Sequence, residues 1–154
     1  MNRVRRLLAT ALFLLLAQAG LAQNLPAKFD PTRDAVADVA AAVAAAKAQQ
    51  KRVIVDVGGE WCPWCHILDR FIAANADVKA LLEANYVWVK VNFSPQNKNE
   101  ALLARWPKVA GYPHLFVLDA DGKLLQSQNT GELEAGKDYD KAKVLAFLRR
   151  HARS

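Results

Sequence analysis

Apolar residues alternate or cluster along the chain in ways that predict a set of strands. Residues 53–57 form a short run of β-branched side chains, which is typical of a strand buried on both faces. Residues 86–92 place valine at every second position, and this alternation predicts another strand. Residues 114–118 and 124–130 flank a turn-forming stretch at 119–122, so they predict two strands joined as a hairpin.

Apolar residues at helical spacing predict helices around these strands. Residues 34–50 lack Gly and Pro and are rich in alanine, which favours a helix. We expect its buried face to consist of Val36, Val39, Ala40 and Val43. Asp30 and Pro31 ahead of it are typical of an N-cap followed by proline at the first helical position. Further helices are expected at residues 63–75, at 77–82, at 100–106 and at 139–151.

The first 22 residues have the pattern of an export signal. Arg3, Arg5 and Arg6 precede an apolar run over residues 7–17, and small side chains follow before Gln23. The apolar run is shorter than the ~20 residues that span a bilayer, which favours a cleaved signal over a membrane anchor. We therefore expect an exported protein, periplasmic if the host is a Gram-negative bacterium.

Composition and charge narrow the function classes. The chain has 154 residues, of which 53% are hydrophobic and 23% charged, as in one packed globular domain. The formal net charge is +6, but the three arginines of the leader account for half of it, which weakens a nucleic-acid interpretation.

Both cysteines of the chain lie in the tetrad Cys62-Pro63-Trp64-Cys65. A disulfide that closes so short a loop adds little stability, so the pair calls for a chemical explanation. The preceding strand and glycine break place Cys62 at the start of the helix predicted at 63–75, where free N–H groups and the helix dipole favour a thiolate. We expect Cys62 to be exposed there and Cys65 to be buried one turn further along.

Asp56 lies six residues before Cys62, on the strand predicted to be buried on both faces. Burial raises the pKa of a carboxyl group, and such a group can exchange a proton with a neighbouring thiol. The alternative role for Asp56 is to cap the following turn.

Residues 53–150 resemble proteins of the thioredoxin fold. The resemblance rests on the segment 53–65, Val-Ile-Val-Asp-Val-Gly-Gly-Glu-Trp-Cys-Pro-Trp-Cys, and on Gly111-Tyr112-Pro113. The alanine-rich helix and the Trp-Cys-x-x-Cys-His core are similar to the exported branch of that family. The resemblance implies an α/β fold with a central mixed β-sheet flanked by helices and an extra N-terminal helix. Together with the export-signal pattern, this resemblance divides the chain into a signal peptide at 1–22, a lead-in and helix at 23–52, and a thioredoxin-like domain at 53–154.

The resemblance also implies a role for individual residues. Cys62 is the expected nucleophile and Cys65 the resolving thiol of a redox-active disulfide, with Asp56 as the buried acid. Pro113 matches a cis-proline that faces the disulfide and leaves the backbone of the preceding residue free to pair with a bound peptide. The residues expected to contact substrate are Trp61, Trp64, Tyr112 and Pro113.

The implied function is a thiol–disulfide oxidoreductase acting on thiols or disulfides of exported proteins. A membrane or soluble redox partner would reset the cysteine pair, and no organic cofactor, metal or nucleic acid is implied. We expect a monomer. The Pro-Trp pair between the cysteines differs from the Gly-Pro of thioredoxins, and the direction of electron flow stays open.

Three other interpretations of the cysteine pair remain. Cys62 to His66 spells Cys-x-x-Cys-His, the attachment pattern of c-type haem, with His114 or His151 as a second axial ligand in place of methionine. A structural zinc site would need four ligands, and the chain has no second cysteine pair. A binding protein with the thioredoxin fold but no turnover is the third.

Overall fold

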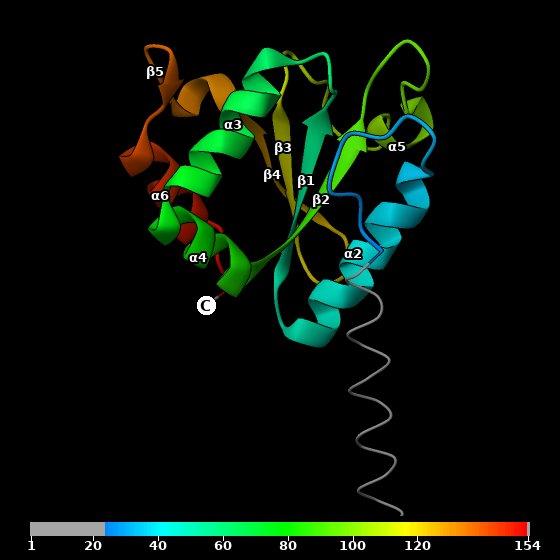
Figure 1. The fold of residues 1–154 in the computed structure, drawn as a ribbon. Helices are drawn as coiled ribbons and strands as arrows, with labels where there is room; N and C mark the ends of the chain where they lie inside the picture. The colour runs from blue at the N-terminus through cyan, green and yellow to red at the C-terminus, as the bar shows by residue number, and fades with distance from the viewer. Residues whose placement is uncertain (1–23, 154) are drawn as a thin grey trace, which may run out of the picture.

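The computed structural model describes residues 24–153, so the signal predicted at 1–22 lies outside the described residues. A four-stranded sheet with the order β2-β1-β3-β4 forms the centre of the fold (Figure 1). β1 is parallel to β2 and antiparallel to β3, which is antiparallel to β4, so the expected mixed sheet is confirmed. The strands are β1 (Arg52–Gly58), β2 (Tyr86–Asn92), β3 (His114–Leu118) and β4 (Leu124–Asn129).

Helices cover both faces of the sheet, because side chains of the inner strands point alternately to either side. In β1, Val53, Val55 and Val57 join one apolar cluster with α2, whereas Ile54 joins the other with α3 and α6. Figure 1 shows α2 and α5 on one side and α3, α4 and α6 on the other. The helices are α2 (Ala35–Gln49), α3 (Pro63–Ala74), α4 (Ala76–Asn85), α5 (Glu100–Leu103) and α6 (Lys141–Arg150).

The helix expected at 34–50 forms, but only part of its expected buried face is confirmed. Val39 is buried and Val43 packs against the same cluster, whereas Val36 and Ala40 are exposed, and the helix packs on the sheet mainly through small side chains. Alanine is the main residue of this face because it lets the helix approach the valines of β1 and β2 closely. The buried residues of α2 are Ala35, Asp38, Val39, Ala42, Ala45 and Ala46.

The N-cap of α2 is Asp34 and not Asp30. The Asp34 carboxylate accepts hydrogen bonds from the backbone N–H groups of Val36 and Ala37. Asp30 instead accepts from the backbone and hydroxyl of Thr32, which makes a separate turn upstream. The expectation that Asp30 and Pro31 begin the helix was therefore wrong, because the Asp-Pro pair forms a turn of its own.

The segment between β4 and α6 holds elements that the hydrophobic pattern did not predict. A 3₁₀ turn (Thr130–Leu133) leads into a hairpin of two-residue strands, β5 (Glu134–Ala135) and β6 (Asp138–Tyr139). The last helix accordingly begins at Lys141, with Asp140 as its N-cap, and not at residue 139. Within residues 24–153, none of the helices combines the length and apolar character that crossing a bilayer requires.

Candidate active site

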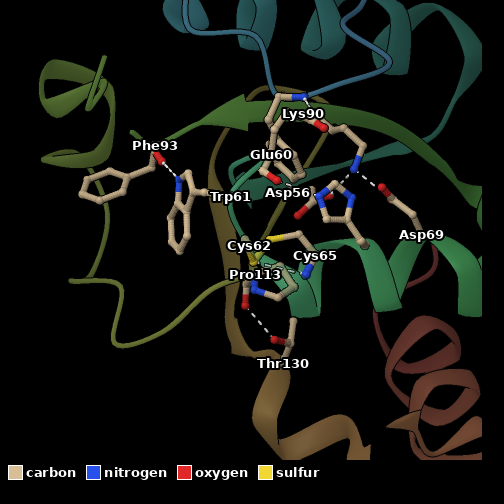
Figure 2. The surroundings of a disulfide bond; sticks show 12 residues. Asp56, Glu60, Trp61, Cys62, Cys65, Asp69, Lys90, Phe93, Pro113 and Thr130 are labelled. Carbon is tan, nitrogen blue, oxygen red and sulfur yellow. Dashed lines mark hydrogen bonds and ion pairs between the residues drawn. A yellow bond between two sulfur atoms is a disulfide. The ribbon is translucent and has the colours of Figure 1, made fainter. Parts of the chain in front are cut away.

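The cysteine pair lies where β1 passes into α3. The chain leaves β1 at Gly58, makes a tight turn in which the Cys62 N–H donates to the carbonyl of Gly59 at 3.0 Å, and enters α3 with Cys62 as its N-cap. Cys62 and Cys65 form a disulfide (Figure 2). The backbone N–H of Cys65 donates to Cys62 Sγ at 3.1 Å and to the Cys62 carbonyl at 3.2 Å, so an N–H group of the first helical turn points at the first sulfur.

Both cysteines are buried, and the expectation of an exposed Cys62 was wrong. Cys62 is 2% exposed and Cys65 1%. Phe29 is buried in the same small cluster, and Trp64 and Tyr112 pack against it. The position of Cys62 at the helix start follows from local sequence, but two of the rings around it, Phe29 and Tyr112, come from distant segments.

Asp56 lies on the same face of β1 as α3 and is 1% exposed. Its Oδ2 accepts a hydrogen bond from Lys90 Nζ at 3.1 Å, and its Oδ1 has no hydrogen-bond partner. Lys90 Nζ also donates to Asp69 Oδ1 on α3 at 2.8 Å (Figure 2). The three charged groups therefore form a chain from the buried strand to the surface, where the Asp69 side chain is 44% exposed.

Burial and charge pairing set the protonation of Asp56 and Lys90. Burial raises the pKa of Asp56, and the ammonium of Lys90 opposes that rise only in part. Burial alone would lower the pKa of Lys90, but the carboxylates of Asp56 and Asp69 outweigh it and raise that pKa. Lys90 stays charged, and Asp56 is a carboxyl group that takes up a proton more readily than an exposed one.

Lys90 is a site residue that the sequence analysis did not identify. The alternation in residues 86–92 puts Lys90 on a strand, on the face opposite the valines, but does not indicate a role for it. The parallel register pairs Asp56 directly with Lys90, so both side chains emerge on the same face. A lysine in the middle of an otherwise apolar strand was the available signal, since lysine is rarely buried without a partner.

Three aromatic rings form a rim beside the disulfide. Trp61 is 52% exposed, and its Nε1 donates to the backbone carbonyl of Phe93 at 2.7 Å (Figure 2). Its ring meets Tyr112 edge-on at a centroid distance of 5.5 Å, and Tyr112 stacks on Phe93 at 4.9 Å. The structure thus brings Trp61 and Tyr112 together and adds Phe93, which the sequence analysis had not singled out.

Trp64 and Pro113 complete the group of expected substrate-contacting residues. The Trp64 ring is half-buried and meets Tyr139 edge-on at 5.6 Å, so it contacts the β5–β6 hairpin as well as the cysteine cluster. The Tyr112–Pro113 peptide bond is cis, as the resemblance implies. The Pro113 carbonyl accepts a hydrogen bond from Thr130 Oγ1 at 2.6 Å (Figure 2).

The histidines that a haem interpretation would use lie in other contacts. His66 Nε2 lies 2.8 Å from the backbone carbonyl of Glu60, and His114 Nε2 lies 2.8 Å from Ser127 Oγ. Within residues 24–153, no group of three or more His, Cys, Asp or Glu side chains is arranged to hold a metal ion.

Comparison with known proteins identifies the family. The family model described as thioredoxin-like matches residues 34–120, which include α2, the cysteine pair and the cis-proline. The chain belongs to the thioredoxin-like family. This match, together with the mixed sheet, favours a redox disulfide over haem attachment at Cys62 and Cys65.

Two similar proteins have names that refer to disulfide chemistry. The chain is 33% identical over 76 residues to the disulfide bond reductase DsbH of Chlamydia pneumoniae, covering 44% of this chain and 45% of that protein. It is 29% identical over 86 residues to the thiol:disulfide interchange protein DsbD of Colwellia psychrerythraea, covering 55% of this chain and 14% of that protein. The alignments therefore span less than half of either relative.

A solved structure matches over a larger share. The crystal structure of a disulphide isomerase from Xylella fastidiosa Temecula1 is similar with a TM-score of 0.68 and 28% sequence identity, covering 82% of this chain and 96% of that one. This chain thus shares its fold, over most of its length, with a protein named as a disulphide isomerase.

Proposed function

We propose that this protein is a thiol–disulfide oxidoreductase that exchanges its Cys62–Cys65 disulfide with the thiols of other proteins. The observation that carries this proposal is the cysteine pair at the N-terminus of α3, where a helix N–H group points at Cys62 Sγ. Such a donor stabilises a thiolate, which is the attacking species in disulfide exchange. Thioredoxin-like family membership and relatives named for disulfide chemistry support the same conclusion.

In the reducing direction the reaction has two exchange steps. The Cys62 thiolate attacks one sulfur of a partner disulfide, which breaks that bond, forms a mixed disulfide and releases the other partner sulfur as a thiolate that takes up a proton. The Cys65 thiolate then attacks Cys62 Sγ, which releases the second partner sulfur and forms the Cys62–Cys65 disulfide. The partner gains two electrons and the cysteine pair loses two. In the oxidising direction both steps run in reverse, and the relative potentials of pair and partner set the direction.

Asp56 is the proposed proton acceptor for Cys65. The Cys65 thiol must lose its proton before it attacks, and burial disfavours the thiolate. Asp56 Oδ1 has no hydrogen-bond partner and lies on the α3 face of β1, so it is free to accept that proton. Lys90 holds Oδ2 at 3.1 Å and keeps the carboxylate oriented, which leaves Oδ1 for the exchange.

We propose that a partner peptide binds beside the aromatic rim. Trp61 supplies an exposed apolar ring, and the Tyr112 backbone next to the cis-proline supplies hydrogen-bonding groups for an extended chain. Trp64 and Pro113 pack at the disulfide end of this surface. A partner must displace or slide along the rings that cover Cys62 before the sulfur atoms can react.

The proposed setting is outside the cytoplasm. The basic and apolar pattern of residues 1–22 supports a cleaved export signal, followed by a lead-in and helix at 23–52 and a thioredoxin-like domain at 53–154. The proposed substrates are thiols or disulfides of exported proteins, and a membrane or soluble redox partner resets the cysteine pair. We propose that the protein acts as a monomer.

Trapping of mixed disulfides tests the roles of the two thiols. In a Cys65→Ser variant Cys62 attacks but nothing resolves the product, so mixed disulfides with exported proteins should accumulate on non-reducing gels. A Cys62→Ser variant should trap almost none, because both cysteines are buried and only Cys62 has a helix N–H group aimed at its sulfur.

Two controls complete the trapping experiment. The double variant with both cysteines replaced measures background capture, and a reductant must release whatever the Cys65→Ser variant holds. Preferential trapping by Cys62→Ser would reverse the assigned roles, and equal background in all variants would contradict the proposed function.

A further inference from the structure

Phe29 belongs to the lead-in before α2, in a stretch that the family model does not match. It is nevertheless 2% exposed and buried together with Cys62 and Cys65. Its backbone N–H donates to Glu60 Oε1 at 3.0 Å, which ties the lead-in to the loop just before the cysteine pair. A residue from outside the matched domain therefore forms part of the wall around the disulfide.

The Phe29 ring contacts the ammonium group of Lys90. Lys90 Nζ lies 4.1 Å from the ring centroid, within the range of a cation–π interaction. The same ammonium lies 3.1 Å from Asp56 Oδ2. The ring therefore packs against the ammonium group that is paired with Asp56.

Gly58 shows how tightly this ring is packed. A Cβ atom placed on Gly58 would lie 2.5 Å from Cys65 Sγ and 3.0 Å from the Cζ atom of Phe29. The strand backbone, the ring and the resolving sulfur therefore meet with no space for a methyl group or a water molecule between them.

Solvent reaches the outer part of Lys90 from two directions. A cavity of about 340 Å³ is lined by Asp69, Trp88 and Lys90, and another of about 450 Å³ is lined by the lead-in residues 25–27 together with Trp88 and Lys90. These cavities give solvent a route to Lys90 but are not lined by Asp56, so the groups packed around Asp56 decide how far its carboxyl group is desolvated.

We infer that Phe29 is a positioning residue of the exchange reaction, whose ring keeps solvent from the buried Asp56–Lys90 pair. This inference rests on the proposed function, in which Asp56 takes the proton of the resolving thiol. Loss of the ring would admit water beside Asp56, and hydration favours the carboxylate. Lys90 would stay in place because Asp69 holds its ammonium at 2.8 Å.

The other groups around Asp56 are the same in the wild-type protein and in variants of Phe29. α3 contributes Asp69 and the disulfide cysteines, β2 contributes Lys90, and the β5–β6 hairpin contributes Tyr139, whose pKa is raised by burial and by nearby carboxylates including Asp56. β3 presents Leu115 opposite Asp56 in the register. Since only Phe29 is changed, a shift in the titration of Asp56 measures how far the Phe29 ring excludes solvent from it.

The test is the titration of Asp56 in the oxidised protein, followed by the carboxyl ¹³C resonance, since the disulfide cysteines do not titrate in this state. Phe29→Ala should move the midpoint of Asp56 to lower pH by about one unit, because burial is the main cause that raises it. Phe29→Leu, which keeps an apolar cover without a ring, should move it less and guards against failure of the alanine variant to fold.

Phe147→Ala is the matched control, since Phe147 is 5% exposed and packs in α6, outside the cluster that holds the cysteines. It should leave the Asp56 midpoint unchanged. Release of a partner from the Cys62 mixed disulfide should show the same downward shift of its pH midpoint in the Phe29 variants only. An unchanged or higher midpoint in the Phe29 variants, or an equal shift in Phe147→Ala, would overturn the inference. A wild-type protein that exchanges no disulfide at any pH would instead contradict the proposed function, while the Asp56 titration would still decide the part played by Phe29.

Discussion

The Asp56→Asn substitution should change how the stability of the oxidised protein depends on pH. Asp56 is 1% exposed, and burial raises its pKa above the ordinary value of 3.8. A carboxyl group with a raised pKa binds its proton more tightly in the folded state than in the unfolded state. Its stabilising effect is therefore complete below the unfolded-state pKa and is lost as the pH rises toward the folded-state pKa.

The size of the effect follows from the linkage between proton binding and folding. Between the two pKa values, one such group lowers the free energy of unfolding by about 1.4 kcal/mol per pH unit. Asparagine has the same shape and no titration, so the variant lacks this slope. Lys90 keeps its bond to Asp69 at 2.8 Å and is not left unpaired. An amide group at the unpartnered Oδ1 position costs on the order of 1–3 kcal/mol at every pH, which shifts the curve without tilting it.

The assay is guanidinium denaturation of both oxidised proteins at a series of pH values above 3.8. The difference in free energy of unfolding, variant minus wild type, cancels the histidines and other groups that titrate in both. This difference should grow with pH and level off above the folded-state pKa of Asp56. Parallel curves over the whole range would refute the argument that burial governs this carboxyl group.

Two further substitutions test packing and capping. Gly58→Ala should destabilise the protein by about 1–3 kcal/mol in guanidinium denaturation, because the new Cβ would lie 2.5 Å from Cys65 Sγ. Gly111→Ala is its control, having no atom within 4 Å of the new Cβ, and an equal effect of the two would contradict the packing argument. Asp34→Ala should cost about 1 kcal/mol in thermal denaturation as a lost helix cap, and Asp30→Ala, which caps no N–H group of α2, should cost less. A larger loss of stability from Asp30→Ala than from Asp34→Ala would contradict the assignment of Asp34 as the N-cap.

The sequence predicted those elements whose side chains follow a period or form an unbroken apolar run. The valines of β2 and the apolar face of α3 have regular spacing, and β1 is a run of β-branched residues. These three elements lie within one or two residues of the expected positions. The Ala35–Gln49 helix was predicted, but valine was taken as the mark of its buried face. Close packing on the sheet selects alanine instead, and alanine is too common on exposed helix faces to identify the buried one.

Contacts between distant segments could not be predicted in the same way. Lys90 meets Asp56 across 34 residues, and the Phe29 backbone meets Glu60 across 31. The first contact depends on the register of two parallel strands, and the second on the path of an irregular lead-in. The β5–β6 hairpin was missed because strands of two residues have no period to detect.

The burial of the cysteine pair has a consequence for selectivity among thiols. Disulfide exchange needs an attacking sulfur to approach in line with the bond, and access limits its rate as much as thiolate content does. With Cys62 2% and Cys65 1% exposed, a thiol that collides at random meets aromatic rings and not sulfur. In the proposed mode of binding, a partner protein held at the rim stays long enough for the rings to move aside, whereas a small thiol does not. We therefore expect the packing around the disulfide to slow its exchange with thiols that do not bind the rim, whatever their potentials.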